Sequence, residues 1–192
     1  MEKLRDDLLA GFKAAGSTKG EQRLRDLVTE SERLRSTPTD QSDFGPLAVT
    51  YAASLAEETF RTAMSVPSDA LQLTEAAPLD EALRLRKEAD SIRQHIYKTE
   101  ITPHDAERLK MKRDVLEALQ ERIDMLDRVQ LRVDELLFQV LRCEGALQRA
   151  RVELVAIRTG SSQAQVDSIT GTLQATFNQV KEVQDELSKL GY

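Results

Sequence analysis

The 192-residue chain is poor in the residues on which enzyme and metal chemistry depends: it has one cysteine, two histidines and no tryptophan. With Cys143 alone, an internal disulfide is impossible and a zinc site of several thiolates is excluded. Neither His95 nor His104 has an acid three positions before it, so the Glu-x-x-His pairs of di-iron bundles are absent. No Gly-rich phosphate loop occurs. We therefore expect no enzyme, with no catalytic residue, no cofactor and no metal.

The chain also lacks long apolar runs and basic segments. No stretch approaches the roughly 18–20 apolar residues that span a bilayer, and the N-terminus has no apolar core of a secretory signal. Together with the single cysteine, this predicts a cytoplasmic protein. The net charge of −6 argues against binding to a phosphate backbone, so we expect no nucleic-acid partner.

What the sequence does have is helical periodicity. From Asp105 to Arg158 the pattern is helical, with no proline and with Gly145 as its one glycine, and from Leu126 to Ile157 apolar residues alternate at spacings of three and four. A helix of about 54 residues would be roughly 80 Å long. Aromatic residues make up only 4%, which suits a thin seam between helices better than a thick core. The predicted fold class is all-α: an elongated helical bundle or antiparallel coiled coil built on this long helix, with shorter N-terminal helices.

Clusters of Pro and Gly divide the remainder of the chain. The periodicity predicts further helices over 2–15, 20–36, from Pro46 to just before Pro67, 79–101 and about 164–190. Thr102-Pro103 supplies a strong start signal for the long helix. The predicted organisation is a short-helix region over 1–66, a connector over 67–78 with at most one turn, and a coiled-coil bundle over 79–192.

Short connections make successive helices antiparallel neighbours. Helix 79–101 is therefore expected along the front half of the long helix and helix 164–190 along its rear half. The apolar stripe of the long helix advances by three residues from Ile123 to Leu126 and again by three to Val129. Two such steps in succession rotate the stripe around the helix axis, so contacts with helix 79–101 should end near residue 126. The residues predicted to pack these helices together are Leu119, Leu126, Val133, Leu136, Val140, Leu147, Leu154, Val180, Val183 and Leu187.

The long helix carries apolar residues beyond one stripe, including Val115, Leu131 and Val155. A face this wide usually contacts two neighbours. The second neighbour is either the N-terminal helices of the same chain, as in a monomeric bundle, or another copy, and we favour a homo-oligomer. The resulting hypothesis is a non-enzymatic scaffold, adaptor or structural assembly protein that acts on protein partners through helix–helix interactions.

Two other surfaces have a functional interpretation. The first helix presents Leu4, Leu8, Leu9 and Phe12, which either dock on the bundle or enter a membrane interface, as in a peripheral membrane-remodelling protein. Docking is favoured because acids lie on the same helix. Basic residues cluster around the turn after helix 79–101. They either bind an anionic partner or form a solvated face on which acids and bases pair. These residues are Arg93, Lys98, Arg108, Lys110, Lys112 and Arg113.

Overall fold

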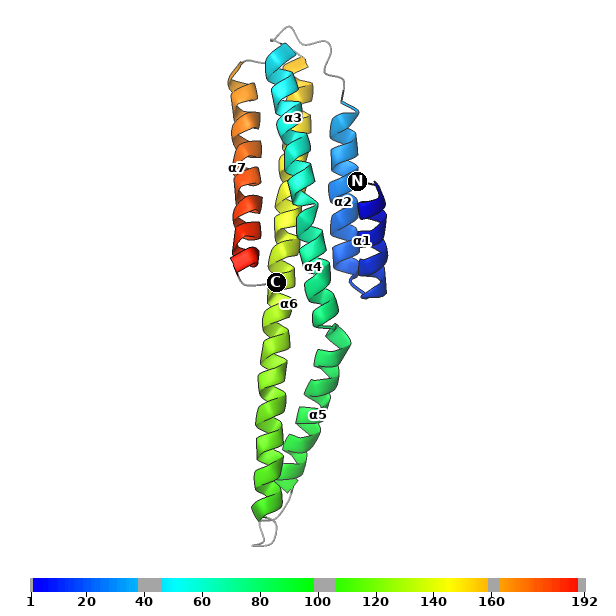
Figure 1. Cartoon of the computed structure of the whole chain (residues 1–192), viewed down its shortest axis with the longest axis vertical. Coiled ribbons are helices and arrows are strands. Elements are labelled where there is room, and N and C mark those ends of the chain that lie inside the picture. Colours follow the sequence, from blue (N-terminus) through cyan, green and yellow to red (C-terminus); the bar gives the residue numbers. More distant parts are fainter. Residues whose placement is uncertain (1, 38–45, 99–105, 159–162, 190–192) are drawn as a thin grey trace. The chain divides into compact units, whose positions relative to one another are not determined.

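A computed structural model describes residues 2–37, 46–98, 106–158 and 163–189. Within them, side chains are described except at 46–49, 79, 156–158, 163–166, 183, 184 and 186–189. The helices are α1 (Glu2–Ala14), α2 (Thr18–Arg35), α3 (Pro46–Ala63), α4 (Ser65–Ala76), α5 (Leu79–Lys98), α6 (Ala106–Arg158) and α7 (Gln163–Lys189) (Figure 1). No strand occurs in these ranges, so the all-α prediction is confirmed for the described part of the chain.

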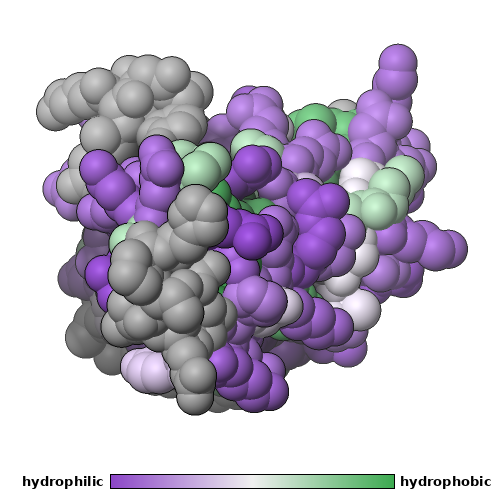
Figure 2. Space-filling view, turned by 90° about the horizontal axis from the view of Figure 1, so that it is seen from below, coloured by the Kyte–Doolittle hydropathy of each residue, from purple (hydrophilic) through white to green (hydrophobic). Residues whose placement is uncertain are grey.

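The long helix is present as α6, which has 53 residues. The predicted start at Thr102-Pro103, together with His104, lies outside the described residues. In the view of Figure 2 the described surface is mainly hydrophilic, with apolar side chains in small separated patches. This is the expected appearance of amphipathic helices that turn their charged faces outward.

The predicted connector over 67–78 is wrong as local structure, because α4 forms a helix over Ser65–Ala76. Pro67 is the third residue of α4, in the first turn, where a backbone N–H has no acceptor within the helix. The side chains of Val66, Ala70 and Leu73 are buried at spacings of four and three. The same apolar periodicity that predicted the other helices therefore continues through this proline.

The turn between α1 and α2 depends on two glycines. Gly16 has φ +69°, a left-handed conformation that favours glycine after a helix. Ser17 then caps α2, its side chain accepting a hydrogen bond from the Gly20 backbone N–H at 3.3 Å. A Cβ at Gly20 would lie 2.4 Å from Cδ1 of Phe12, so glycine lets the aromatic ring pack directly on the α2 backbone.

The chain divides into two compact units. Unit 1 comprises residues 1–71 and 135–192, and unit 2 comprises residues 72–134. This grouping differs from the predicted division at 66 and 79, because N-terminal helices and the rear part of α6 belong to one unit. Within unit 1, α3 packs against α2 and α7. Arg35 of α2 also pairs with Glu57 of α3 at 2.7 Å and lies over the Phe60 ring.

The core of unit 1 contains large side chains that are almost completely buried. They are Phe12, Leu24, Leu27, Met64, Val66, Leu136, Leu137, Val140, Leu147, Ile169 and Leu173. They come from α1, α2, α4, α6 and α7, together with Met64 between α3 and α4. Burial of this many large apolar groups is the dominant stabilising term in a helical unit.

Unit 2 has a thinner core between α5 and the first part of α6. Its buried residues are Ala77, Ala82, Leu85, Ala89, Ile123 and Leu126, with Leu116, Leu119 and Val129 packed against them. Two ion pairs join the helices at the surface, Arg86 with Asp127 at 2.5 Å and Arg122 with Glu81. The cluster extends along α6 only as far as Val129, close to residue 126, where the rotation of the stripe was expected.

Candidate functional site

The residues predicted to pack the helices lie mostly in the interior. Buried side chains are Leu126, Val133, Leu136, Val140, Leu147, Leu154 and Val180. Leu119 is half-buried, and Val183 and Leu187 lie outside the described side chains. The apolar residues at these positions therefore serve as core, and a binding surface has to be sought among the side chains that the helices leave exposed.

The apolar face of α1 is also occupied within its own unit. Leu8 and Phe12 are buried, Leu9 is half-buried, and only Leu4 has a large exposed fraction, 41%. Entry into a membrane interface would require the same side chains to leave the core. Within the described ranges, every helix is too short or too polar to cross a bilayer.

The basic residues at the end of α5 and the start of α6 lie at the surface. Arg93, Lys98, Arg108, Lys110 and Arg113 are exposed and Lys112 is half-buried. Arg93 pairs with Asp90 at 2.8 Å, on its own helix. This local pair agrees with the interpretation of a solvated face.

A different part of α6, in unit 1, carries apolar side chains that are exposed at the surface. Phe138 is 56% exposed and Val152 is 54% exposed. Gly145 lies midway between them, so the three positions recur every seven residues and share one face of the helix. Val155 is exposed and Leu141 half-buried beside the same column. Leu136, Val140 and Leu147 of this segment are buried, so the exposed column is a second apolar stripe in addition to the core stripe.

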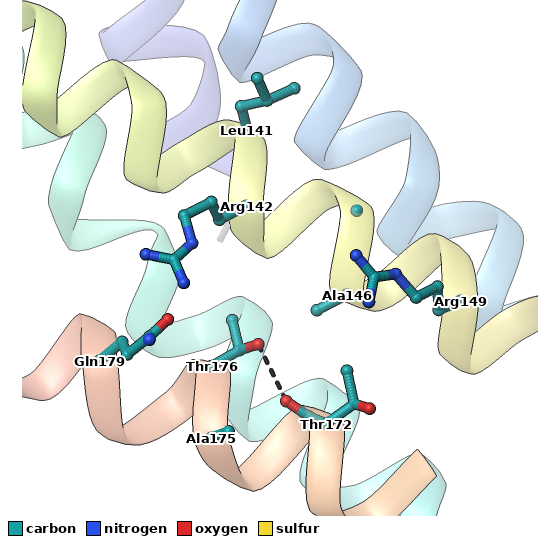
Figure 3. A pocket seen from close by; sticks show the side chains of 9 residues that line it. Leu141, Arg142, Ala146, Arg149, Thr172, Ala175, Thr176 and Gln179 are labelled. Carbon is teal, nitrogen blue, oxygen red and sulfur yellow. Dashed lines mark hydrogen bonds between the residues drawn. The ribbon is translucent and has the colours of Figure 1, made fainter. Parts of the chain in front are cut away.

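A groove of about 530 Å³ runs beside this column, between α6 and α7 (Figure 3). Its lining residues are Leu141, Arg142, Gly145, Ala146, Arg149, Thr172, Ala175, Thr176 and Gln179. Small side chains keep the groove open, because Gly145, Ala146 and Ala175 leave the space that larger residues would fill. The Thr176 hydroxyl donates to the Thr172 carbonyl at 2.9 Å and is thereby held on its own helix.

Two arginines give this groove its charge. The side chains of Arg142 and Arg149 extend from α6 on the side of α7 (Figure 3). Both are exposed, and neither forms an ion pair or hydrogen bond with another described residue. The lining contains no carboxylate. Because the arginines are seven residues apart, about 10.5 Å along the helix, the groove presents two separated positive charges next to an apolar column.

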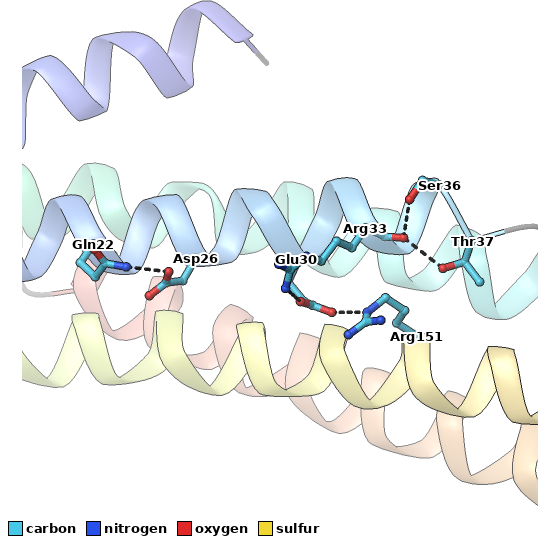
Figure 4. Close-up of polar contacts among 7 residues, drawn as sticks. All are labelled: Gln22, Asp26, Glu30, Arg33, Ser36, Thr37 and Arg151. Atoms are coloured by element: carbon cyan, nitrogen blue, oxygen red, sulfur yellow. Dashed lines mark hydrogen bonds and ion pairs between the residues drawn. The ribbon is translucent and has the colours of Figure 1, made fainter.

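A partly buried ion pair connects α2 to α6 within unit 1 (Figure 4). Arg151 Nε donates to Glu30 Oε1 at 2.5 Å, and Arg33 lies 3.4 Å from Glu30 Oε2. The Glu30 side chain is buried, so its charge depends on these two arginines. The pair therefore joins α2 to the face of α6 that lies toward it.

Two further groups on α6 titrate abnormally. Burial raises the pKa of the Glu144 carboxyl, helped by Asp26 and Glu30 and opposed by Arg23, and its Oε2 atom has no hydrogen-bond partner in the described structure. Burial raises the pKa of the Cys143 thiol to about 12, although Arg142 opposes this. The thiol therefore stays protonated and lacks the thiolate character of a nucleophile. Among the described side chains no group of three potential metal ligands occurs.

Sequence reasoning did not predict the groove or its two arginines. A signal was present, since Arg142 and Arg149 repeat at seven residues beside Phe138, Gly145 and Val152. The groove nevertheless also needs Thr172, Ala175 and Thr176 of α7, and their position beside α6 follows only from the fold. Comparison with known protein families, with curated protein sequences and with solved structures finds no match to this chain.

Proposed function

We propose that this protein is a non-enzymatic helical scaffold or adaptor that binds a partner helix on the outer face of α6 in unit 1. The observation that carries the proposal is the column of Phe138, Gly145 and Val152 beside the α6–α7 groove, in which both large side chains are exposed. In the proposed architecture α5 and α7 are antiparallel coiled-coil partners of α6, and this column is the third surface of the long helix.

The chemistry of the column favours a helical partner. Apolar side chains repeated every seven residues match the spacing of anchors on an amphipathic helix. Gly145 in the middle of the column allows a close approach of two helix backbones, since it has no side chain and nothing lies within 4 Å of a Cβ built there. Phe138 and Val152 at either end supply the apolar area that such a helix would bury.

The groove is better suited to binding than to catalysis. Its lining offers two guanidinium groups, hydroxyls and an amide, but no carboxylate, histidine or cysteine to act as base or nucleophile. Arginines that pair with no other described residue provide specificity through charge, while the apolar column provides affinity. Membrane binding by α1 has less support, because Leu8 and Phe12 are buried.

The test is site-specific photo-crosslinking. A photoreactive amino acid replaces Phe138 or Val152, and in the matched control it replaces Glu58, an exposed residue of α3. We expect discrete adducts with a bound partner polypeptide from the two α6 positions and none from the control position. Equal labelling from all three positions, or no adduct from Phe138 and Val152, would contradict the proposal.

A further inference from the structure

We propose that the α6–α7 groove of one copy binds the Glu107–Met125 segment of α6 from a second copy. This inference rests on the proposed function and names the partner of the same surface. It is carried by two surfaces of one chain, one in each unit, whose charges are opposite and whose charge spacing is the same.

The receiving surface has three properties that restrict its occupant. Arg142 and Arg149 require negative groups about 10.5 Å apart along a helix. The column of Phe138 and Val152 requires apolar side chains next to those acids. The glycine at the centre requires an occupant without a bulky side chain at the corresponding level.

The first part of α6, within unit 2, meets all three requirements. Met111 is 65% exposed and Met125 51% exposed, and Val115 between them is also exposed. Ala118 supplies the small residue, so the four positions follow the spacing of four, three and seven of one helix face. This face is distinct from the stripe of Leu116, Leu119, Ile123 and Leu126 that packs with α5.

Acids flank this face at the spacing of the two arginines. Glu107, Asp114 and Glu121 recur every seven residues, all are exposed, and none forms an ion pair or hydrogen bond with another described residue. Whichever direction the incoming helix takes, two consecutive acids of this set can lie opposite Arg142 and Arg149. Charge-assisted pairs of this kind fix the register of two helices, while apolar contacts supply most of the affinity.

A second copy fits better than an unrelated acidic helix for a structural reason. Unit 2 is a helix pair with an alanine-rich core, and such a pair usually needs a third helical surface to be secure. Docking of the Glu107–Met125 segment covers Met111, Val115 and Met125, and it covers Phe138 and Val152 in the same step. Both exposed apolar faces of α6 are then accounted for by one contact.

The experiment compares three charge variants with the wild-type chain by sedimentation equilibrium at low salt. The acid variant carries Glu107→Arg, Asp114→Arg and Glu121→Arg, and the groove variant carries Arg142→Glu and Arg149→Glu. Each is expected to weaken association by roughly tenfold or more, because attractive pairs become repulsive. The swap variant combines all five substitutions and should regain most of the association, since opposite charges again face each other.

A control variant with Glu58→Arg and Glu75→Arg adds positive charge at exposed positions off this face, and should associate like the wild type. Circular dichroism of every variant checks that the helices remain folded. A wild-type chain that stays single at every concentration overturns the docking of a second copy. Association that survives both reversals, or that the swap variant does not regain, overturns it as well. If position 138 forms an adduct with a different protein and none with a second copy, the result supports the scaffold function and overturns self-docking. If it forms no adduct at all, the proposed function fails as well.

Discussion

Unit 1 and unit 2 use the same helix in different ways. In unit 1 the rear part of α6 contributes Leu136, Val140 and Leu147 to a core that also draws on α1, α2, α4 and α7. In unit 2 the front part of α6 packs a single stripe against α5, and half of the six buried residues are alanines. Since alanine buries little apolar area, unit 2 gains less stabilisation per residue than unit 1. A continuous helix can therefore belong to a thick core at one end and to a thin two-helix core at the other.

The two parts of α6 also bury different sides of the helix. In unit 2 the buried residues of α6 include Ile123, Leu126 and Val133, and in unit 1 the stripe continues with Leu136 and Val140. The steps of three around Val129 rotate the stripe between these segments. Each segment consequently leaves a different apolar face exposed, Met111 to Met125 in one and Phe138 to Val152 in the other. These faces are what the proposed assembly would cover.

The largest expected effect distinguishes the core stripe from the exposed stripe of the same helix segment. Replacing Val140 and Leu147 together with Asp should cost more than about 4 kcal/mol and abolish cooperative unfolding, because buried carboxylates lose hydration without gaining partners. The matched pair Phe138→Asp and Val152→Asp adds the same charges at exposed positions and, at a concentration at which the chain is single, should melt nearly as the wild type does. Thermal unfolding followed by circular dichroism measures both. Similar melting curves for the two double variants would refute the assignment of the buried stripe.

The second prediction separates the stabilities of the two units. Leu85→Ala removes one of the few large side chains in the core of unit 2 and should cost about 2–3 kcal/mol. Hydrogen exchange should accelerate in α5, while α2 in unit 1 keeps its protection. Equal acceleration in α2 would mean that the chain unfolds as one cooperative block and that the two units do not differ in stability.

The third prediction concerns the ion pair between Glu30 of α2 and Arg151 of α6. Arg151→Met leaves the buried Glu30 carboxylate with Arg33 alone and should cost about 2 kcal/mol. As a matched control, Arg25→Met breaks the exposed pair with Glu21 and should cost no more than about 0.5 kcal/mol. Urea unfolding gives both values. Equal costs for the two variants would show that the Glu30–Arg151 pair behaves as an ordinary surface pair.

The smallest effect depends on pH. The pKa of Glu144 is raised in the folded chain above its ordinary value of 4.5. The folded state therefore holds this proton more tightly, and the stability it contributes is present below pH 4.5 and is lost as the pH rises through the folded-state pKa. Glu144→Gln removes the buried charge and should stabilise the chain at neutral pH by about 1 kcal/mol. The increase in the free energy of unfolding should disappear in acid, where Glu144 of the wild type is protonated. Urea unfolding at several pH values measures it, and an increase that does not depend on pH would contradict the role of ionisation.

Helices with long apolar periodicity could be predicted from the sequence. Features formed by residues of different helices could not, because the sequence does not show which helices become neighbours. The extent of α6 followed from a stripe without interruption, and α5 and α7 followed from shorter stripes of the same kind. Pro67 was interpreted as the end of a helix, whereas the fold places it in a first turn, and the buried spacing of Val66, Ala70 and Leu73 was the signal for α4. The groove could not be predicted, because Arg142 and Thr172 become neighbours only when α7 lies beside α6.

Self-docking is tested most simply by the absolute mass of the wild-type chain, by light scattering after size exclusion over a range of concentrations. In the proposed assembly the exposed faces of α6 join one copy to another. This assembly predicts a mass that rises above the 21.6 kDa of a single chain as concentration increases and that falls back in high salt, as charged pairs are screened. A mass of 21.6 kDa at every concentration and salt would contradict it.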